Sequence, residues 1–223
     1  MSMHIPQGPR SGGDTLQDLA AMSPNIRPYP CDVTDAEASR SVAEVIEREI
    51  GAIDLAILNA GVFHPMTASK YDADLARSSN AINYVGVVNA LAPVMKAMIA
   101  RGSGHIAIVS SVAGYRGLPK GAAYAPTKAA LISLAESLNT DLKLKGVTMT
   151  VINPGYVATP MTEPVTFPMP FIIPVDEAVR QIRRGLDRGR FEIVFPSRMK
   201  RLMKLLRILP YAIYFPLVAM ISR

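Results

Sequence analysis

Short apolar runs alternate with helix-length segments along most of this chain of 223 residues. The runs lie at residues 53–58, 105–110, 147–152 and 191–195, and they are mainly apolar instead of alternating between apolar and polar side chains. Strands of this kind are buried on both faces, which is typical of a parallel sheet with helices on its two sides. The pattern therefore predicts an α/β fold built on a doubly wound parallel sheet.

Helices are expected between these strands. A Thr34-x-x-Glu37 capping-box pattern opens the first of them, at 34–49. The others are expected at 71–100, 121–145 and 175–188, with a short helix at 14–22. A further strand, weakened by two prolines, is expected at 26–31.

The composition is that of a globular protein, with 49% hydrophobic and 19% charged residues. The single cysteine, Cys31, excludes an internal disulfide framework and fits a reducing compartment. Residues 1–13 lack the apolar centre of a secretory signal and are expected to be disordered. Since no apolar run reaches the roughly 18–20 residues of a membrane span, we expect a cytoplasmic protein.

The net charge of +6 is confined to the C-terminal segment. Residues 198–223 contain six basic residues and no acidic one, and the remaining 18 basic residues equal the 18 acidic residues. A neutral body, with no aromatic residues interleaved in a broad basic surface, argues against a nucleic-acid partner.

Ligands of parallel sheets bind beyond the carboxyl ends of the strands. Three polar or glycine-containing segments stand at those ends in this sequence: Asn59-Ala60-Gly61, Ser110-Ser111 and Asn153-Pro154-Gly155. The chemistry of the protein is therefore expected at this edge of the sheet.

Tyr124 and Lys128 are four residues apart at the start of a helix, so their side chains share a face. An ammonium about 4 Å from a phenol would lower the phenol pKa by roughly three units from about 10, toward the range of efficient acid–base catalysis. The Ser111 hydroxyl, at the end of a strand, is suited to bind a carbonyl or alcohol oxygen held against that phenol. An isolated Tyr-x-x-x-Lys spacing also occurs on solvated helix faces. The pair therefore indicates a catalytic site only together with a residue such as Ser111.

Taken together, these residues resemble the short-chain dehydrogenase/reductase family, which has a Rossmann-like doubly wound fold. The resemblance covers about residues 14–195, in the order and spacing of the family. The matching segments are Asp32-Val33-Thr34, Asn59-Ala60-Gly61, Asn83-Tyr84-Val85-Gly86, Ser110-Ser111-Val112-Ala113-Gly114, Tyr124-Ala125-Pro126-Thr127-Lys128 and Asn153-Pro154-Gly155-Tyr156-Val157-x-Thr159.

The resemblance implies catalytic roles for four residues. Tyr124 would be the acid–base on the substrate oxygen, and Ser111 would orient and stabilise that oxygen. Lys128 would lower the pKa of Tyr124 and bind the nicotinamide ribose. Asn83 would hold a water in a proton relay that ends at Lys128. The reaction implied is hydride transfer between NAD or NADP and a small-molecule carbonyl or alcohol, in a homo-oligomer with no metal.

The resemblance also implies the cofactor contacts. Asp32 and Val33 would lie at the adenine, Asn59, Ala60 and Gly61 at the ribose, and Pro154, Gly155, Val157 and Thr159 at the nicotinamide, with Tyr124 and Lys128 completing the set. Ordinary structural roles stay open for some members: Asp32 or Thr159 as a helix cap, and Pro154-Gly155 as a turn.

The sequence departs from the family pattern at its N-terminus. The family begins with a strand, a glycine-rich phosphate-binding turn, a helix and a second strand, whereas the glycine cluster here, Gly8-x-x-x-Gly12-Gly13, follows no apolar strand. We therefore expect a sheet that lacks the first strand–helix–strand unit, either because the start is truncated or because the short form is genuine. In the second case the alternative is a non-catalytic protein that cannot bind dinucleotide.

We place the family core at 14–196, with a distinctive loop inside it and a C-terminal tail after it. Residues 160–174 are rich in Pro, Met, Phe and Ile and predict either an apolar cover for a hydrophobic substrate or a plain surface loop. The tail at 197–223 combines a basic amphipathic helix over 197–209 with an apolar stretch at 211–221. That tail predicts either contact of 198–221 with a membrane surface, which would make the protein peripheral to the membrane, or packing on the body or a partner subunit.

Overall fold

The computed structural model describes residues 18 and 20–221 and contains a parallel sheet of four strands. The strands are β1 (Leu55–Leu58), β2 (Gly104–Val109), β3 (Val147–Pro154) and β4 (Glu192–Phe195), and they lie in that order across the sheet. The four strands expected from the apolar runs and the parallel sheet are therefore confirmed.

The register of the strands aligns their carboxyl ends. Leu58 pairs with Ile108, and Val109 pairs with Ile152. The segments that follow β1, β2 and β3 consequently leave the sheet at one edge, where the sequence predicted the chemistry.

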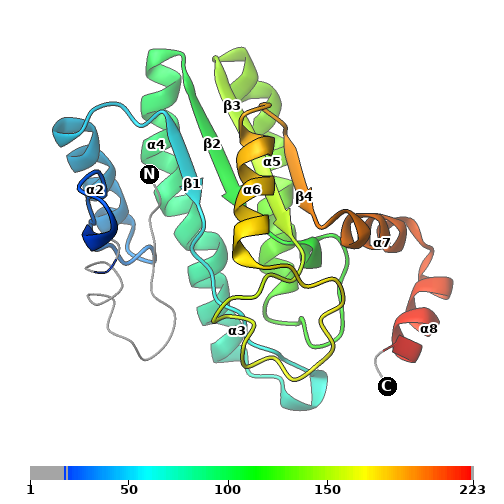
Figure 1. The fold of residues 1–223 in the computed structure, drawn as a ribbon. Coiled ribbons are helices and arrows are strands. Elements are labelled where there is room, and N and C mark those ends of the chain that lie inside the picture. The colour runs from blue at the N-terminus through cyan, green and yellow to red at the C-terminus, as the bar shows by residue number, and fades with distance from the viewer. Residues whose placement is uncertain (1–17, 19, 222–223) are drawn as a thin grey trace.

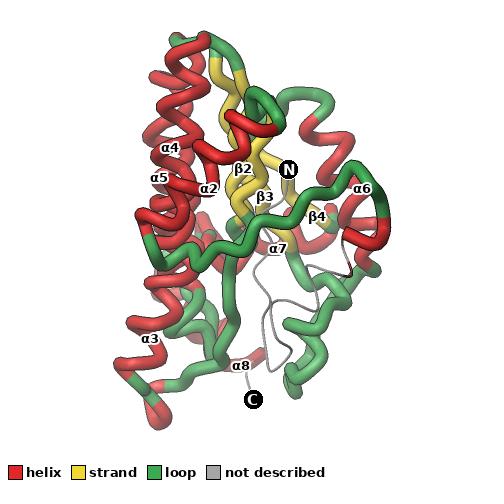
Figure 2. Tube along the Cα trace, turned by 90° about the vertical axis from the view of Figure 1, so that its left-hand side faces the viewer, coloured by secondary structure: helices red, strands yellow, loops and turns green. Residues whose placement is uncertain are grey.

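Helices cover both faces of the sheet, as Figures 1 and 2 show. On one face lie α2 (Ala36–Glu49), α4 (Gly86–Arg101) and α5 (Ala125–Leu144), and on the other α6 (Val175–Leu186) packs against β3 and β4. The main core lies between the first set of helices and the sheet, where Met98, Ile106 and Leu131 are fully buried. This arrangement is the doubly wound α/β fold.

The helical stretch expected at 71–100 is continuous but not uniform. It runs from α3 (Ala73–Asn80) through a π-helical turn (Ala81–Val85) into α4. By length and composition, Ala73–Arg101 is the one helical stretch in the described residues that satisfies the criteria for crossing a membrane. Its α4 part packs on β1 and β2 in the protein core, and a core helix satisfies the same criteria.

Two local predictions near the first helix are wrong. Residues 26–31 form no strand, since Pro28 and Pro30 have no N–H to donate to a sheet ladder. Asp35, and not Thr34, caps α2 by accepting hydrogen bonds from the backbone N–H groups of Glu37 and Ala38. Thr34 instead donates its hydroxyl to Asp32.

Most of the predictions for the N-terminus fall outside the described residues. Of the helix expected at 14–22, residues 18 and 20–22 are helical. The expected disorder of 1–13 and the Gly8-x-x-x-Gly12-Gly13 cluster cannot be compared with the structure. Within the described residues, no strand precedes α2.

The tail forms two helices, α7 (Ser197–Ile208) and α8 (Tyr211–Ile221), and one face of it joins the main core. The guanidinium of Arg116 fixes their junction: it donates to the carbonyl oxygens of Arg207 and Leu209, and its Cζ lies 4.4 Å from the ring centroids of both Tyr211 and Tyr214. Packing on the body, one of the two predictions for the tail, is therefore observed.

Candidate active site

Tyr124 and Lys128 are placed by the start of α5. Tyr124 is the N-cap residue, and Pro126 fits the first turn because no intrahelical bond needs its missing N–H. Lys128 follows one turn later, on the same face as Tyr124. Its Nζ lies 5.6 Å from the centroid of the Tyr124 ring, as the spacing predicted.

The Lys128 side chain is 3% exposed, an unusual environment for an ammonium. Its Nζ donates to the carbonyl oxygen of Val109, the last residue of β2, over 3.0 Å. Burial lowers the pKa of Lys128 from 10.5 to about 8, because the charged form loses its hydration.

Burial acts in the opposite direction on the phenol of Tyr124. It raises the pKa of Tyr124 from 10.0 to about 12, although the hydrogen bond with the Ser111 hydroxyl lowers this pKa in part. The expected lowering by Lys128 is not seen in this structure, where desolvation dominates and the ammonium is bonded to Val109. At neutral pH the phenol is protonated.

Ser111 lies two residues after the end of β2 and is the N-cap residue of a short 3-10 turn, Val112–Gly114. Its Oγ accepts a hydrogen bond from the backbone N–H of Ala113 and donates to the carbonyl oxygen of Pro154 over 3.3 Å. This turn packs tightly on α5, since a Cβ at Gly114 would lie 2.7 Å from the backbone carbonyl carbon of Lys128. The close approach holds Ser111 beside Tyr124.

Asn83 lies in the π-helical turn and is fully buried. Its Oδ1 accepts from the N–H of Val62 over 2.6 Å, and its Nδ2 donates to the carbonyl oxygen of Val62 and to the Thr127 hydroxyl. A Cβ at Gly61 would lie 3.3 Å from both Asn83 Oδ1 and Lys128 Nζ, so only a glycine leaves this space open. The structure thus brings Asn83, Gly61 and Lys128 together.

Asn59 and Ala60 follow β1 directly at the same edge of the sheet, with Asn59 exposed. Asn59 and Ala60 therefore form the chain that leads from β1 into Gly61, and their contact with a ribose stays a prediction.

Asp32 and Val33 are held against α4 rather than among the catalytic residues. Val33 is buried, and its carbonyl oxygen accepts a hydrogen bond from Asn89 over 2.9 Å. The backbone and side chain of Thr34 both donate to Asp32, which lowers the pKa of that carboxyl. Asn89 was missed in the sequence, where a single polar residue in an apolar helix gave no signal.

The segment after β3 contains the residues that the resemblance assigns to the nicotinamide. Gly155 donates its N–H to the carbonyl oxygen of Phe195 over 2.7 Å, and Val157 forms a bridge with Ile173. The carbonyl oxygen of Thr159 accepts from the N–H of Thr162, so Thr159 opens a turn and caps no helix. The carbonyl oxygen of Pro154 accepts the hydrogen bond from Ser111, which connects Pro154 to the catalytic residues.

Aromatic side chains from distant segments form a chain of ring contacts that begins at Tyr124. The Phe63 ring meets the Tyr124 ring edge to face at 5.1 Å between centroids, and Phe167 lies 6.4 Å from both Phe63 and Tyr156. The bridge between Val157 and Ile173 closes the loop that carries Phe167. Phe63 was missed in the sequence, where it is one apolar residue after a strand.

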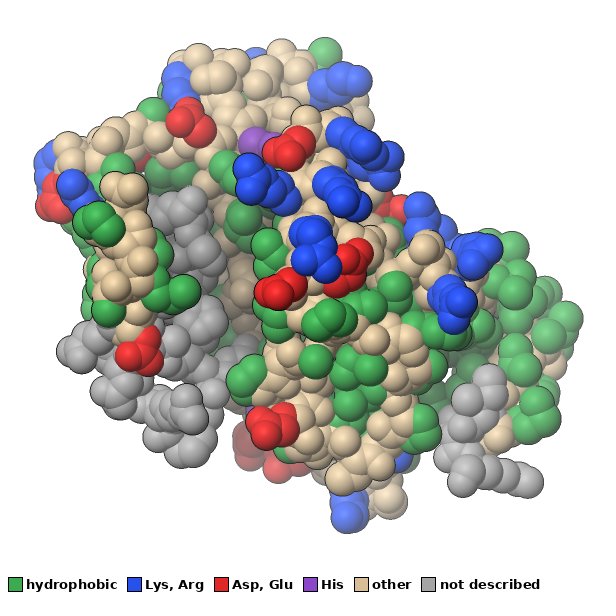
Figure 3. All heavy atoms as spheres, in the orientation of Figure 1, with side chains coloured by type: hydrophobic (Ala, Val, Ile, Leu, Met, Phe, Trp, Pro, Cys, Tyr) green, Lys and Arg blue, Asp and Glu red, His purple; other side chains and the backbone are tan. Residues whose placement is uncertain are grey.

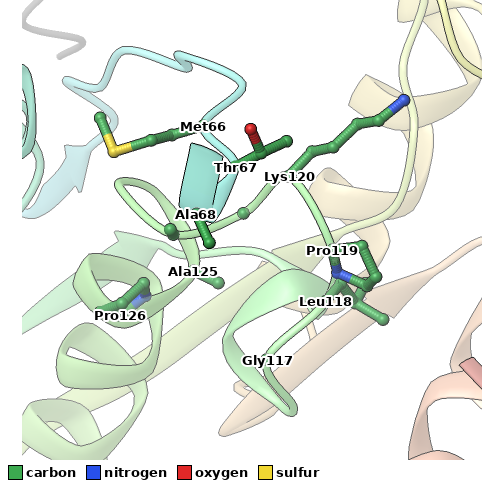
Figure 4. A pocket seen from close by; sticks show the side chains of 11 residues that line it. Met66, Thr67, Ala68, Gly117, Leu118, Pro119, Lys120, Ala125 and Pro126 are labelled. Carbon is green, nitrogen blue, oxygen red and sulfur yellow. The ribbon is translucent and has the colours of Figure 1, made fainter. Parts of the chain in front are cut away.

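A cavity of about 490 Å³ opens next to the start of α5, and none of the catalytic or aromatic residues named above lines it (Figure 4). Its walls come from the segment after β1, from the loop before Tyr124 and from the first turn of α5. The lining residues are Met66, Thr67, Ala68, Gly117, Leu118, Pro119, Lys120, Gly121, Ala122, Ala125 and Pro126.

Residues 8–168 match the family described as short chain dehydrogenase, which covers more than half of the chain. The chain belongs to the short-chain dehydrogenase family. The members of this family are oxidoreductases, and their general chemistry is NAD(P)-dependent oxidation and reduction.

Curated relatives agree with this assignment. An uncharacterized oxidoreductase of Myxococcus xanthus is 35% identical over 200 residues, which cover 89% of this chain and 79% of the relative. Human epidermal retinol dehydrogenase 2 is 28% identical over 194 residues, 83% of this chain and 62% of that protein. The probable oxidoreductase EphD of Mycobacterium tuberculosis is 35% identical over 178 residues, which are only 29% of its length.

Solved structures share the fold. A short-chain dehydrogenase from Burkholderia cenocepacia in complex with NADP is 26% identical, with a TM-score of 0.74, and the match covers 84% of this chain and 76% of that chain. An NAD⁺-bound xylitol dehydrogenase is 34% identical over 60% of this chain and 52% of its own, with a TM-score of 0.58.

The described residues of this short-chain dehydrogenase fit one half of the family's dinucleotide. Lys128 uses one of its three N–H donors on Val109 within the part of the chain described here, and Gly61 places its backbone beside that ammonium. These features suit a nicotinamide ribose. The described residues contain no glycine-rich turn of the kind that binds the pyrophosphate in this family.

Replacing Lys128 with Met tests the burial of its charge. The folded pKa of about 8 lies below the unfolded value near 10.5, so the unfolded chain binds more protons between these two pH values. The free energy of unfolding of the parent protein should therefore rise by about 3 kcal/mol from pH 8 to pH 10.5, relative to Lys128→Met. Urea denaturation across this pH range measures the difference.

Lys96→Met is the matched control, because Lys96 is exposed on α4. Its unfolding profile should follow the parent profile at every pH. Parallel profiles for the parent and Lys128→Met would contradict the buried ammonium.

Proposed function

We propose that this protein interconverts a carbonyl and an alcohol with NAD or NADP, using Tyr124 as the acid–base and acting on an apolar substrate. The observation that carries the proposal is the meeting of Ser111, Tyr124 and Lys128 at the carboxyl edge of the sheet. The segment after β2 supplies Ser111 and the start of α5 supplies Tyr124 and Lys128, so two elements bring together the groups that acid–base catalysis on a bound oxygen requires.

Tyr124 supplies or removes the proton on the substrate oxygen. With a pKa of about 12, the phenol is protonated at neutral pH and can donate to the oxygen of a carbonyl as the alcohol forms. The cofactor supplies or accepts the hydride at the carbon atom. In the reverse direction the phenolate takes the proton from the alcohol.

Ser111 orients the substrate oxygen beside the phenol. Its present hydrogen bond to Pro154, at 3.3 Å, is at the long end of the range and therefore weak. Replacing this hydrogen bond with one to a substrate oxygen therefore costs little free energy. The Ser111 backbone does not need to move, since the turn at Gly114 is fixed against α5.

Lys128 binds the ribose and stabilises the phenolate. Its buried ammonium has two N–H donors available beyond the one that Val109 accepts, counted over the described residues. A positive charge near the phenol becomes effective once a ligand excludes water, because the interaction strengthens in a low dielectric. That Asn83 holds a water in a proton relay stays a prediction. In this structure its side-chain amide forms hydrogen bonds with Val62 and Thr127.

The aromatic group around Tyr124 supports an apolar substrate. Phe63 places ring surface at Tyr124, Phe167 packs on Phe63, and the loop that carries Phe167 is the predicted cover. The human relative is named for retinol, which is an apolar alcohol. The homo-oligomer and the cytoplasmic location stay predictions from the resemblance and the composition.

Replacing Tyr124 with Phe removes the proton donor and keeps the ring. We expect kcat for the NADPH-dependent reduction of decanal to fall about 100-fold or more, with the fold and cofactor affinity preserved. Tyr71→Phe, at an exposed tyrosine, is the control and should keep full activity. Retained turnover in Tyr124→Phe would show that another group transfers the proton.

Replacing Phe167 with Ala tests the apolar cover. We expect KM for decanal to rise about tenfold, because a contact between apolar surfaces is lost, while KM for glyceraldehyde should change little. Phe171→Ala is the control, since Phe171 lies in the same loop and is exposed. An equal effect of Phe167→Ala on both aldehydes would refute the assignment of Phe167 to substrate selection.

A further inference from the structure

The C-terminal helices expose an apolar face. Seven large apolar side chains between residues 202 and 220 are 39% to 76% exposed: Leu202, Leu205, Ile208, Tyr211, Ile213, Phe215 and Met220. Single exposed apolar residues are common on proteins, but a contiguous group is typical of an interaction site.

This face is distinct from the one that packs on the body. Met199, Met203 and Leu206 of α7 are buried in the main core, and so is Tyr214 of α8. The Tyr214 hydroxyl donates to the carbonyl oxygen of Gly117, which fixes α8 on the loop before Tyr124. The exposed residues therefore lie on helices whose orientation is already set, and folding of the tail does not bury them.

Basic side chains stand among the exposed apolar ones. Arg198, Arg201, Leu205 and Ile208 follow one another at intervals of three or four residues, so they share one face of α7. Neither Arg198 nor Arg201 forms an ion pair with an acidic residue of the described chain. The sequence from 197 to 223 contains no acidic residue at all.

The neighbouring helix extends the basic surface. Lys and Arg side chains gather over α6 and α7 in Figure 3, and hydrophobic side chains cover α8 beside them. On and just after α6, the exposed residues include Arg183, Arg184, Arg188 and Arg190. Acidic residues accompany the basic ones on α6 but are absent from α7 and α8, where exposed apolar and basic side chains together have the composition that binds at the headgroup level of an anionic bilayer.

We propose that the exposed face of α7 and α8 binds the surface of an anionic membrane. Charge complementarity selects this occupant: in a symmetric contact between two copies, the same basic residues would face each other and repel. Helix α8 has 11 residues and a length of about 16 Å, against about 30 Å for the hydrocarbon core, so it lies in the interface and does not span it.

Co-sedimentation with lipid vesicles tests the proposal on the 223-residue chain. We expect the protein to pellet with vesicles of phosphatidylglycerol and phosphatidylcholine, and about tenfold less with phosphatidylcholine alone. Raising the salt concentration should release it, because salt screens the attraction.

Two double variants separate the apolar and the basic contributions. Arg198→Glu with Arg201→Glu, and Ile213→Ser with Phe215→Ser, should each weaken binding to the anionic vesicles about tenfold or more. All four side chains are exposed, so the fold should be kept, and circular dichroism verifies this. Matched controls that should bind as the parent does are Arg48→Glu on α2 and Leu144→Ser at the end of α5, where the side chain is 80% exposed.

The proposal is overturned if the parent protein pellets with neither kind of vesicle, or if both double variants pellet as the parent does. It is also overturned if the variants change the mass of the particle in light scattering, because the face would then be a contact between copies of this chain. Vesicle binding needs neither cofactor nor turnover, so this test is independent of the reaction proposed for Tyr124.

Discussion

The buried ammonium of Lys128 is the constraint on which the arrangement of the candidate site depends. A charge inside a protein needs partners, and the carbonyl oxygen of Val109 at the end of β2 supplies one. That bond ties the first turn of α5 to the edge of the sheet and places Tyr124 next to Ser111. The same burial lowers the pKa of Lys128 and raises that of Tyr124, so the shifted pKa values of both groups have one physical cause.

A second set of contacts connects the tail to the strands that carry the site. The Tyr115 hydroxyl donates to Glu192 of β4 over 2.5 Å and accepts from Asn153 of β3 over 3.1 Å, and Lys204 of α7 forms an ion pair with Glu192. Tyr115 directly follows the turn that begins at Ser111. The tail is thus part of the framework around the candidate site as well as the bearer of an exposed apolar face.

The sequence predicted the sheet well because its strands are buried on both faces, and such strands are continuous apolar runs. The four-residue spacing alone predicted that Tyr124 and Lys128 share one helix face. Other features depend on contacts that spacing does not contain. Thr34 and Asp35 are both good helix caps, and only the local backbone decides between them. The pKa of Tyr124 depends on how far burial outweighs a nearby charge.

Contacts between residues distant in the sequence could not be predicted for the same reason. Phe63 and Phe167 meet although they are distant in sequence, and neither forms part of a pattern. In α7 the apolar residues Met199 and Leu202 follow one helical spacing, yet the first is buried and the second exposed. A helix that is apolar on two sides does not reveal in its sequence which side faces the protein.

Whether this chain binds a dinucleotide decides between an active oxidoreductase and a non-catalytic relative. Calorimetric titration of the 223-residue protein with NADH and with NADPH measures this directly. The account predicts saturable binding of one nucleotide per chain for at least one of the two, weakened in Lys128→Met because a donor to the ribose is lost. Absence of saturable binding for both nucleotides would contradict the proposed reaction and favour the non-catalytic alternative.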